Sequence, residues 1–355
     1  MILLFCIDIL IYILIGSLRF QTVKLAILGC GFLGKQILIQ AKAQYPKESL
    51  LASITEQRAE RFNEIKALGG TPIQFYLDGT DRHITESQLR KKYIATPSQR
   101  SFLTSDAYVI AIPPRRQLGA ITDRYPNEMA LWLRLLALAH LPLPASEVLN
   151  NSNNSKRTIK RIVFISSTSV YADRPLPNGR KMGRSAVVDE NDMLEPVSIA
   201  GKTLRKIEIM LQTWSSANPD FQVSLLRLGG LVGKGRHPYR FFKSKDALLV
   251  KSLDLPTNLI HVKDAAALAL KIISTNPFPK DETFNGVVST HPSRYTLYKK
   301  IISKDSLFEA KLENQSPSLR KGKIVDNQKV KDVLNYTFYY DDIRTWAEES
   351  WDETS

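Results

Sequence analysis

The stretch VKLAILGCGFLGKQILIQAKA, residues 23–43, carries the strongest indication of fold in this 355-residue chain. It opens with an apolar run typical of a buried strand and passes through Gly29-x-Gly31-x-x-Gly34. It then continues over 35–43 with apolar residues at helical spacing. A strand that enters such a glycine turn, followed by a helix that leaves it, is the context in which this pattern predicts a dinucleotide-binding site.

Each glycine of the turn has a separate expected task. Gly29 permits a tight turn, Gly31 lets the backbone approach a pyrophosphate, and Gly34 lets the helix pack closely on the strand. The helix N-terminus supplies N–H groups and the positive end of its dipole for the phosphates. Cys30 is expected to contribute its backbone and not a reactive thiol. The turn residues expected at the cofactor are Gly29, Gly31, Phe32, Leu33 and Gly34.

Strand-like and helical segments alternate along the chain after this turn. Apolar runs typical of strands recur at 50–54, 73–77, 107–112, 162–166 and 223–228. Stretches with helical periodicity separate most of these runs. The alternation predicts an α/β fold, with a parallel sheet covered by helices on both faces.

Residues that follow the second, third and fourth strands bear on the cofactor. About twenty residues beyond the turn, an acid would favour NAD through the ribose 2′-hydroxyl, and an arginine would favour NADP through its 2′-phosphate. Glu56 and Arg58 both lie there and argue in opposite directions, so the choice within NAD(P) stays open. Asp78, at the end of the third strand, is a candidate contact for the adenine edge. Pro113 lies in the turn after the fourth strand, which is expected to pass along the cofactor.

Composition restricts the partners and the compartment. The 49 Lys and Arg against 35 Asp and Glu give a formal charge of +14, which favours anionic partners. The charges are dispersed, and no signature with stacked aromatics stands out, so no nucleic-acid partner is expected. Two cysteines exclude a disulfide framework, and the five histidines show no ligand spacing, so no metal site is expected. These features fit a reducing, cytoplasmic location.

The first residues form a separate apolar leader. Residues 2–18, ILLFCIDILIYILIGSL, carry Asp8 as their one charge and have the shortest length that spans a bilayer. One interpretation is a membrane tether through residues 1–18, with the rest of the chain on the cytoplasmic face because Arg19 and Lys24 follow the run. The other, slightly favoured, is a translated upstream extension, since the first strand of a complete domain begins only a few residues later.

Two later segments resemble the extended short-chain dehydrogenase/reductases, the NAD-dependent epimerase/dehydratase superfamily. Residues 162–171, IVFISSTSVY, are similar to the family's strand that ends in SS-x-x-V-Y. Residues 226–236, LRLGGLVGKGR, are similar to its R-L-x-x-x-Y-G-P-G-R stretch, with Val232 in place of the tyrosine.

Two further segments follow in the family's order. Residues 258–264, NLIHVKD, are similar to its I-H-V-x-D segment, and Phe284-Asn285 to the Y-N strand after it. The resemblance implies a Rossmann-type doubly wound parallel sheet with a small C-terminal substrate lobe. It also implies pairing of helix faces in a homodimer. The expected organisation is the leader at 1–20 and one NAD(P)-binding domain at 21–355, with an interleaved lobe at about 229–260 and 275–355.

The resemblance places a catalytic centre on the strand end and the next helix. The family pairs a Ser or Thr with a Tyr-x-x-x-Lys motif. Its serine falls on Ser167, with Thr168 the nearest alternative, and its lysine falls on Lys202. Ser198 stands where the tyrosine belongs, and no tyrosine occurs between Tyr171 and Tyr239. A serine hydroxyl is a far weaker acid than a phenol, so the expected active site is atypical.

Other positions receive expectations on the same basis. Thr168, Arg236 and His237 are candidate substrate contacts, and Arg236 would hold an anionic group. Arg227 is expected to brace the end of the sheet, and His261 is expected to cap the helix that begins near Asp264. The leading hypothesis is an oxidoreductase or epimerase that acts on a nucleotide sugar or similar anionic metabolite. The alternative is a non-catalytic NAD(P)-binding sensor or regulatory protein.

Overall fold

The computed structural model describes residues 23–55, 58–113, 121–141, 158–172, 181–182, 185–236, 253–302 and 322–343. The leader, the polar loop at 150–155, Glu56 and His237 lie outside these residues. Within the described part of the chain, no helix has both the length and the apolar character needed to cross a bilayer.

The main sheet is parallel and doubly wound. Its order is β11-β8-β5-β4-β1-β2-β3, so the chain runs outward from β1 through β2 and β3 and then returns to β4 on the other side of β1. This Rossmann-type arrangement confirms the expected fold class. It puts a topological switch point, where such sheets bind ligands, at the carboxyl ends of β1 and β4. The strands are β1 Lys24–Leu28, β2 Ser49–Ile54, β3 Thr71–Gln74, β4 Ala107–Ile110, β5 Lys160–Ser167, β8 Phe221–Leu228 and β11 Thr283–Gly286.

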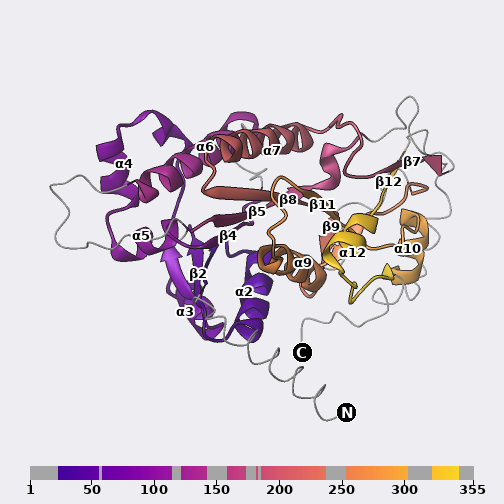
Figure 1. The fold of residues 1–355 in the computed structure, drawn as a ribbon. Helices are drawn as coiled ribbons and strands as arrows, with labels where there is room; N and C mark the ends of the chain where they lie inside the picture. Colours follow the sequence, from indigo (N-terminus) through magenta and orange to yellow (C-terminus); the bar gives the residue numbers. More distant parts are fainter. Residues whose placement is uncertain are drawn as a thin grey trace, which may run out of the picture.

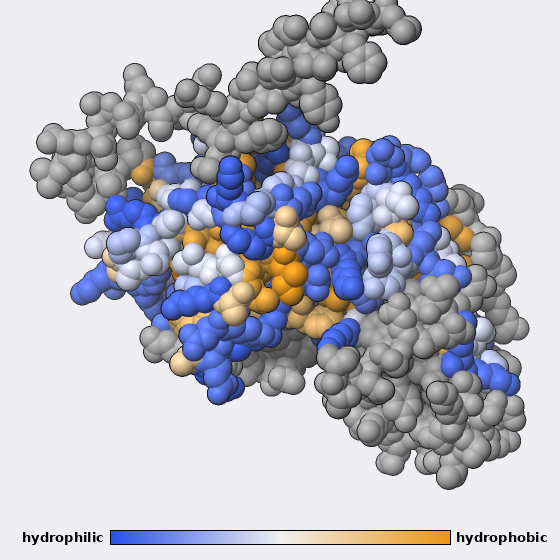
Figure 2. Space-filling model, turned by 90° about the horizontal axis from the view of Figure 1, so that it is seen from below, coloured by the Kyte–Doolittle hydropathy of each residue, from blue (hydrophilic) through white to orange (hydrophobic). Residues whose placement is uncertain are grey.

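Helices cover both faces of this sheet. Figure 1 shows α6 and α7 along one face, with α4 and α5 beyond α6, and α2, α3 and α9 on the opposite face. Seen from the side of α2, hydrophilic residues surround a central area where hydrophobic residues gather (Figure 2). The described helices are α2 Phe32–Gln44, α3 Ala59–Ala67, α4 Glu86–Tyr93, α5 Pro97–Leu103, α6 Ile121–His140, α7 Ile199–Ala217, α9 Val262–Ser274, α10 Arg294–Ile302 and α12 Gln328–Leu334, with short 3-10 helices η1 Gly79–His83 and η4 Thr168–Val170.

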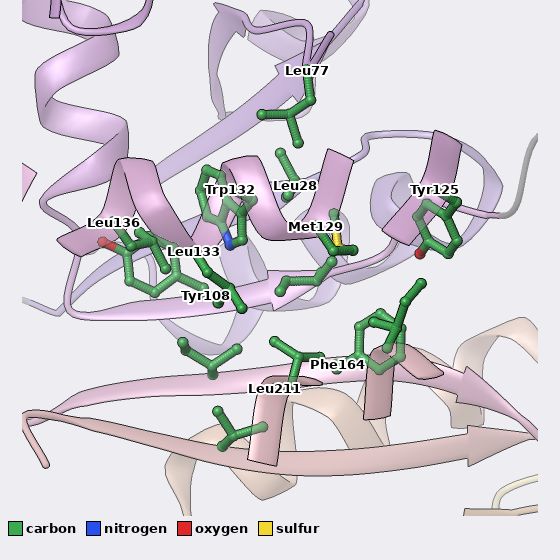
Figure 3. Close-up of a cluster of buried hydrophobic side chains, with 14 of the residues drawn as sticks. Leu28, Leu77, Tyr108, Tyr125, Met129, Trp132, Leu133, Leu136, Phe164 and Leu211 are labelled. Carbon is green, nitrogen blue, oxygen red and sulfur yellow. The ribbon is translucent and has the colours of Figure 1, made fainter. Parts of the chain in front are cut away.

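An aromatic core fills the space between the sheet and α6. Trp132 of α6 is fully buried and meets Tyr108 of β4 edge-on, with ring centroids 5.7 Å apart. The ring of Phe75 also packs against this indole, with ring centroids 5.8 Å apart. Figure 3 shows Trp132 and Met129 between the helix and the strands, with Phe164 of β5 on the other side of the cluster. Burial of these large rings fixes the position of α6 on the sheet.

Two strands end earlier than their apolar runs. β3 spans Thr71–Gln74 and so includes only the first two residues of the predicted run at 73–77. β4 spans Ala107–Ile110 and leaves out the last two residues of the run at 107–112. In each case the neighbouring strand stops at the same level: Ile54 pairs with Gln74, and Leu28 pairs with Ile110. Beyond β3, Phe75 and Leu77 are buried but Tyr76 is exposed, and Ala111 and Ile112 beyond β4 are half-buried. Apolar character therefore extended these predictions too far.

Two small sheets stand beside the main one. One joins β9 Gly230–Val232 to β10 Leu259–His261, and the other has the order β12-β7-β6, with β6 Lys181–Met182, β7 Ser185–Val188 and β12 Lys323–Val325. β11 lies in the segment assigned to the C-terminal lobe, yet it is the edge strand of the main sheet and pairs with β8. The C-terminal segments and the sheet are therefore interleaved.

A buried polar network ties α7 to the sheet. Arg227 of β8 donates two hydrogen bonds to Glu208 of α7, from Nε at 3.0 Å and from Nη2 at 2.9 Å. Its Nη1 also donates to the Tyr171 hydroxyl, which in turn donates to Asn285 of β11. Ser166 donates to Glu208 as well. Arg227 thus braces the carboxyl end of β5 and β8, as expected.

Replacing Glu208 by glutamine should lower the free energy of unfolding by about 3 kcal/mol, because Arg227 would keep a buried charge without a carboxylate. Equilibrium unfolding in urea measures this loss. The matched control is Glu282→Gln, which removes the half-exposed partner of Lys329 and should cost less than about 1 kcal/mol. Equal losses in the two variants would contradict the role given to Glu208.

Candidate functional site

The glycine turn joins β1 to α2 at the switch point. Gly29 has a φ of +100°, a conformation that favours glycine, and its N–H donates to the Ser53 hydroxyl at 2.8 Å. The N–H of Cys30 donates to the Ser53 carbonyl at 3.0 Å. The start of the turn is therefore fixed to the end of β2, and sequence reasoning did not identify Ser53 as its anchor.

The other two glycines differ in what surrounds them. A Cβ on Gly34 would lie 2.2 Å from the carbonyl oxygen of Gly29, so α2 packs on the turn closer than any side chain allows. A Cβ on Gly31 would meet nothing within 4 Å. Gly34 thus serves packing, and the space over Gly31 is open to a ligand.

The N-terminus of α2 offers unpaired donors at this opening. Gly31 is the N-cap and supplies no side-chain hydrogen bond, and the first turn carries no acidic residue. The first helical bond runs from the Lys35 N–H to the Gly31 carbonyl at 2.9 Å. The N–H groups of Phe32, Leu33 and Gly34 precede it and have no intrahelical acceptor. They form a group of donors suited to an anion.

A charged cluster beside the turn was missed by sequence reasoning. Arg61 of α3 donates to the Cys30 carbonyl at 2.9 Å and pairs with Glu64 at 2.6 Å. Lys35 of α2 pairs with the same carboxylate. The i, i+3 spacing of Arg61 and Glu64 predicts their contact with each other, but their approach to the turn needs the tertiary fold.

The cysteine of the turn is an inert thiol. Cys30 is 3% exposed, and burial raises its pKa to about 11, although Arg61 and Lys35 lower it in part. The thiol therefore stays protonated at neutral pH, in agreement with the backbone role expected for it.

The positions expected around the adenosine end are only partly described. Arg58 is exposed and is the N-cap of α3, without a side-chain capping bond. Asp78 lies four residues beyond β3 as the N-cap of η1 and accepts hydrogen bonds from the N–H and hydroxyl of Thr80, which lower its pKa. Pro113 is exposed in the loop that follows β4. Asp78, Tyr76 and Arg124 line an open cavity of about 730 Å³.

A second group of expected residues meets at the carboxyl end of β5. A Cβ on Gly201 of α7 would lie 2.2 Å from the Ser169 carbonyl oxygen, so the first turn of α7 packs directly on η4. This contact places the first turn of α7, which carries Ser198 and Lys202, against the 3-10 helix that Ser167 caps. The role of Gly201 was not identified from the sequence.

The hydroxyls of this group already make local hydrogen bonds. Ser198 is the exposed N-cap of α7, and its Oγ accepts from the Gly201 N–H at 3.0 Å. Ser167 Oγ caps η4 by accepting from the Ser169 N–H at 3.2 Å. Thr168 is buried and Lys202 is exposed. Both serines keep an O–H that can donate to another group, because a hydroxyl accepts and donates at once.

The structure also gives the surroundings of two residues from the later motifs, Arg236 and His261. The Arg236 guanidinium lies over the Phe32 ring, 5.1 Å from its centroid. His261 caps α9 as expected, since its Nδ1 accepts from the Lys263 N–H at 3.3 Å. Burial lowers its pKa to about 4, so the ring is neutral and able to accept. Among the described residues, no three His, Cys, Asp or Glu side chains form a metal site.

Comparison with known proteins gives relatives in sequence and in fold. No protein-family model matches the chain. Protein YeeZ of Escherichia coli K12 is 30% identical over 243 residues, which cover 68% of this chain and 74% of YeeZ. UDP-glucuronic acid 4-epimerase of Bacillus cereus, solved with UDP-glucuronic acid and NAD, superposes with a TM-score of 0.62 at 16% identity, over 93% of this chain and 98% of that one.

A second enzyme of different activity has the same fold. dTDP-glucose 4,6-dehydratase of Bacillus anthracis, solved with NAD, gives a TM-score of 0.60 at 12% identity, over 93% of this chain and 96% of that one. The chain therefore has the same Rossmann-type fold as these epimerase and dehydratase structures. At these identities, the likeness to solved structures shows the fold alone.

Cys30 should react slowly with maleimide at pH 8 in the native protein and rapidly in denaturant, because its thiolate is scarce below a pKa of about 11. Peptide mapping by mass spectrometry reads Cys30 separately from Cys6, the other cysteine. Rapid native labelling of Cys30 at pH 8 would contradict an inert, buried thiol.

Proposed function

This chain belongs to the same protein family as YeeZ of Escherichia coli, and we propose that it binds NAD(P) and acts as an oxidoreductase or epimerase. Its substrate would be a nucleotide sugar or a similar anionic metabolite, in keeping with the charge of +14. The observation that carries the proposal is the open space over Gly31 at a helix N-terminus that no side chain caps. Solved structures of the same fold contain NAD, which supports the choice of cofactor.

The residues at the turn fit a dinucleotide. Gly29 and Gly31 would let the backbone approach the diphosphate, and the free N–H groups of Phe32 and Leu33 would donate to it. Asp78 would contact the adenine edge, and Pro113 would lie along the cofactor. Glu56 and Arg58 remain the two candidates for reading the ribose 2′ group. When bound, the nicotinamide would supply the hydride exchange.

The catalytic roles fall on the group at the end of β5. The Lys202 ammonium would donate hydrogen bonds to the cofactor ribose. The Ser167 hydroxyl, with Thr168 as the alternative, would donate to an oxygen of the substrate. Ser198 would occupy the tyrosine position of related enzymes, and its high hydroxyl pKa makes it a poor proton donor at neutral pH. We therefore propose an atypical active site, in which proton transfer is slower than with a phenol or uses a group of the substrate.

A non-catalytic sensor is the second candidate. The Ser198 hydroxyl accepts a hydrogen bond from the Gly201 N–H and so caps α7. This capping stabilises the helix whether or not a substrate is bound. A chain with that task at the tyrosine position would bind the dinucleotide and report its presence to a partner. For either candidate we propose a cytoplasmic location, since the cysteine content fits a reducing compartment. A membrane tether at 1–18 and a homodimer are further proposals.

Gly31→Arg should abolish dinucleotide binding and leave the fold intact, because its side chain enters open space that a diphosphate would need. Titration of the full-length wild type and the variant with NADH and with NADPH, followed by nicotinamide fluorescence, measures the effect. The dinucleotide that the wild type prefers also shows which residue contacts the ribose: preference for NADH favours Glu56, and preference for NADPH favours Arg58. Gly34→Ala is the structural control: its Cβ clashes with the Gly29 carbonyl, so it should lower the melting temperature. Wild-type affinity in Gly31→Arg would contradict the proposed site.

Lys202→Ala should reduce turnover of nucleotide sugars by at least about tenfold, since it removes the ammonium that would hold the cofactor ribose. Lys206→Ala is the matched control, one turn further along the same exposed face of α7, and should leave turnover unchanged. Assays with NAD(P) and a panel of nucleotide sugars compare the two variants. Equal rates in the Lys202 variant and the wild type would contradict the catalytic assignment, and binding without turnover in the wild type would favour the sensor.

A further inference from the structure

We propose that Arg236 clamps the diphosphate of the cofactor from a seat on the Phe32 ring, rather than holding the substrate. This inference rests on the proposed function, because it names a further determinant of the same dinucleotide site. It reassigns a residue that the sequence placed among the substrate contacts.

The turn that carries Arg236 lies against the glycine turn. A Cβ on Gly233 would lie 3.2 Å from Cζ of Phe32 and 2.6 Å from the Val262 side chain, so the end of β9 approaches both closely. The Arg236 N–H donates to the Gly233 carbonyl at 2.8 Å, and Gly235 between them has a φ of +76°, which favours glycine. This tight turn directs Arg236 back toward α2.

The ring that receives the guanidinium belongs to the expected phosphate site. Phe32 is the first residue of α2 and directly follows Gly31, whose open side faces the proposed ligand. The guanidinium carbon lies 5.1 Å from the ring centroid, within the range of a cation–π contact. Among the described residues, this ring is the one partner that the structure gives to the Arg236 side chain.

The electrostatic arrangement calls for an anion. A cation near the positive end of a helix dipole is unfavourable unless negative charge lies close to both. The first turn of α2 has no acidic residue, and the nearby Glu64 already pairs with Lys35 and Arg61. A diphosphate would satisfy both the helix N–H groups and the guanidinium, whose planar donors match phosphate oxygens in pairs.

The location favours the cofactor over the substrate. Arg236 contacts α2, whereas Ser167, the proposed substrate contact, caps η4 beside α7, which lies on the opposite face of the sheet (Figure 1). A residue that binds the substrate would be expected near Ser167, at the carboxyl end of β5. The contact with Phe32 places Arg236 beside the turn that follows β1.

The test compares Arg236→Gln with Lys234→Gln in the full-length protein. Lys234 carries the same charge two residues away and is also exposed, which makes its variant a control for net charge. Arg236→Gln should weaken binding of the preferred dinucleotide and of ADP by roughly tenfold or more, the scale of a lost hydrogen bond to a charged group. Lys234→Gln should change both affinities less than about twofold. The melting temperature of the ligand-free protein should stay the same in both variants, because both side chains are exposed.

A second variant tests the contact between the Arg236 guanidinium and the Phe32 ring. Phe32→Leu keeps an apolar residue at the helix start and removes the ring face, so it should weaken dinucleotide binding a few-fold, as expected for a lost cation–π contact. Arg236→Lys should recover part of the affinity, since it restores charge without the paired donors.

The outcomes separate this inference from the proposed function. If the wild type binds a dinucleotide and Arg236→Gln binds it equally well, the clamp is wrong while the proposed function stands. If Arg236→Gln raises only the KM for the substrate, the residue belongs to the substrate site and the clamp is also wrong. If the wild type binds no dinucleotide, both the proposed function and this inference are overturned.

Discussion

The site depends on one contact between two stretches of backbone, where Gly34 of α2 faces the carbonyl oxygen of Gly29 at the end of β1. A Cβ would lie 2.2 Å from that oxygen, so the helix reaches this position only without a side chain. The contact fixes where α2 begins, and its beginning fixes where the free N–H groups point. The open side of Gly31 and the donors of Phe32 follow from this arrangement.

A second close contact between a helix glycine and a carbonyl oxygen lies on the other face of the sheet. Gly201 of α7 faces the Ser169 carbonyl oxygen, again with a Cβ distance of 2.2 Å. The buried pair of Arg227 and Glu208 then holds α7 to β8. One glycine contact therefore shapes the proposed cofactor site at the carboxyl end of β1. The other packs the proposed catalytic segment at the carboxyl end of β5, on the other side of β4.

Much of this fold follows from local patterns in the sequence. Apolar runs and the glycine spacing predict the strands, the turn and α2, because burial and backbone geometry impose those residues directly. The ends of strands are harder to predict from sequence. β3 stops where its neighbour β2 ends, and this limit depends on pairing between strands and not on the residues of β3 itself. Sequence alone also missed Arg61, whose contact with the Cys30 carbonyl depends on how α3 packs.

The candidate site shows a similar division. The order of the motifs predicts roles for Ser167 and Lys202, and the packing of Gly201 on η4 holds the segments that carry them against each other. The capping role of Ser198 had a sequence signal, since a serine just before an apolar helical run is a common N-cap. The seat of Arg236 on Phe32 had none, because it joins residues about two hundred positions apart through a tertiary contact.

Amide hydrogen exchange over residues 31–34, with and without saturating NADH or NADPH, tests the central claim most directly. Exchange should slow at Phe32, Leu33 and Gly34 when the dinucleotide is added, because their N–H groups gain phosphate acceptors. Unchanged exchange in this segment, with the dinucleotide bound elsewhere or not bound, would contradict the account.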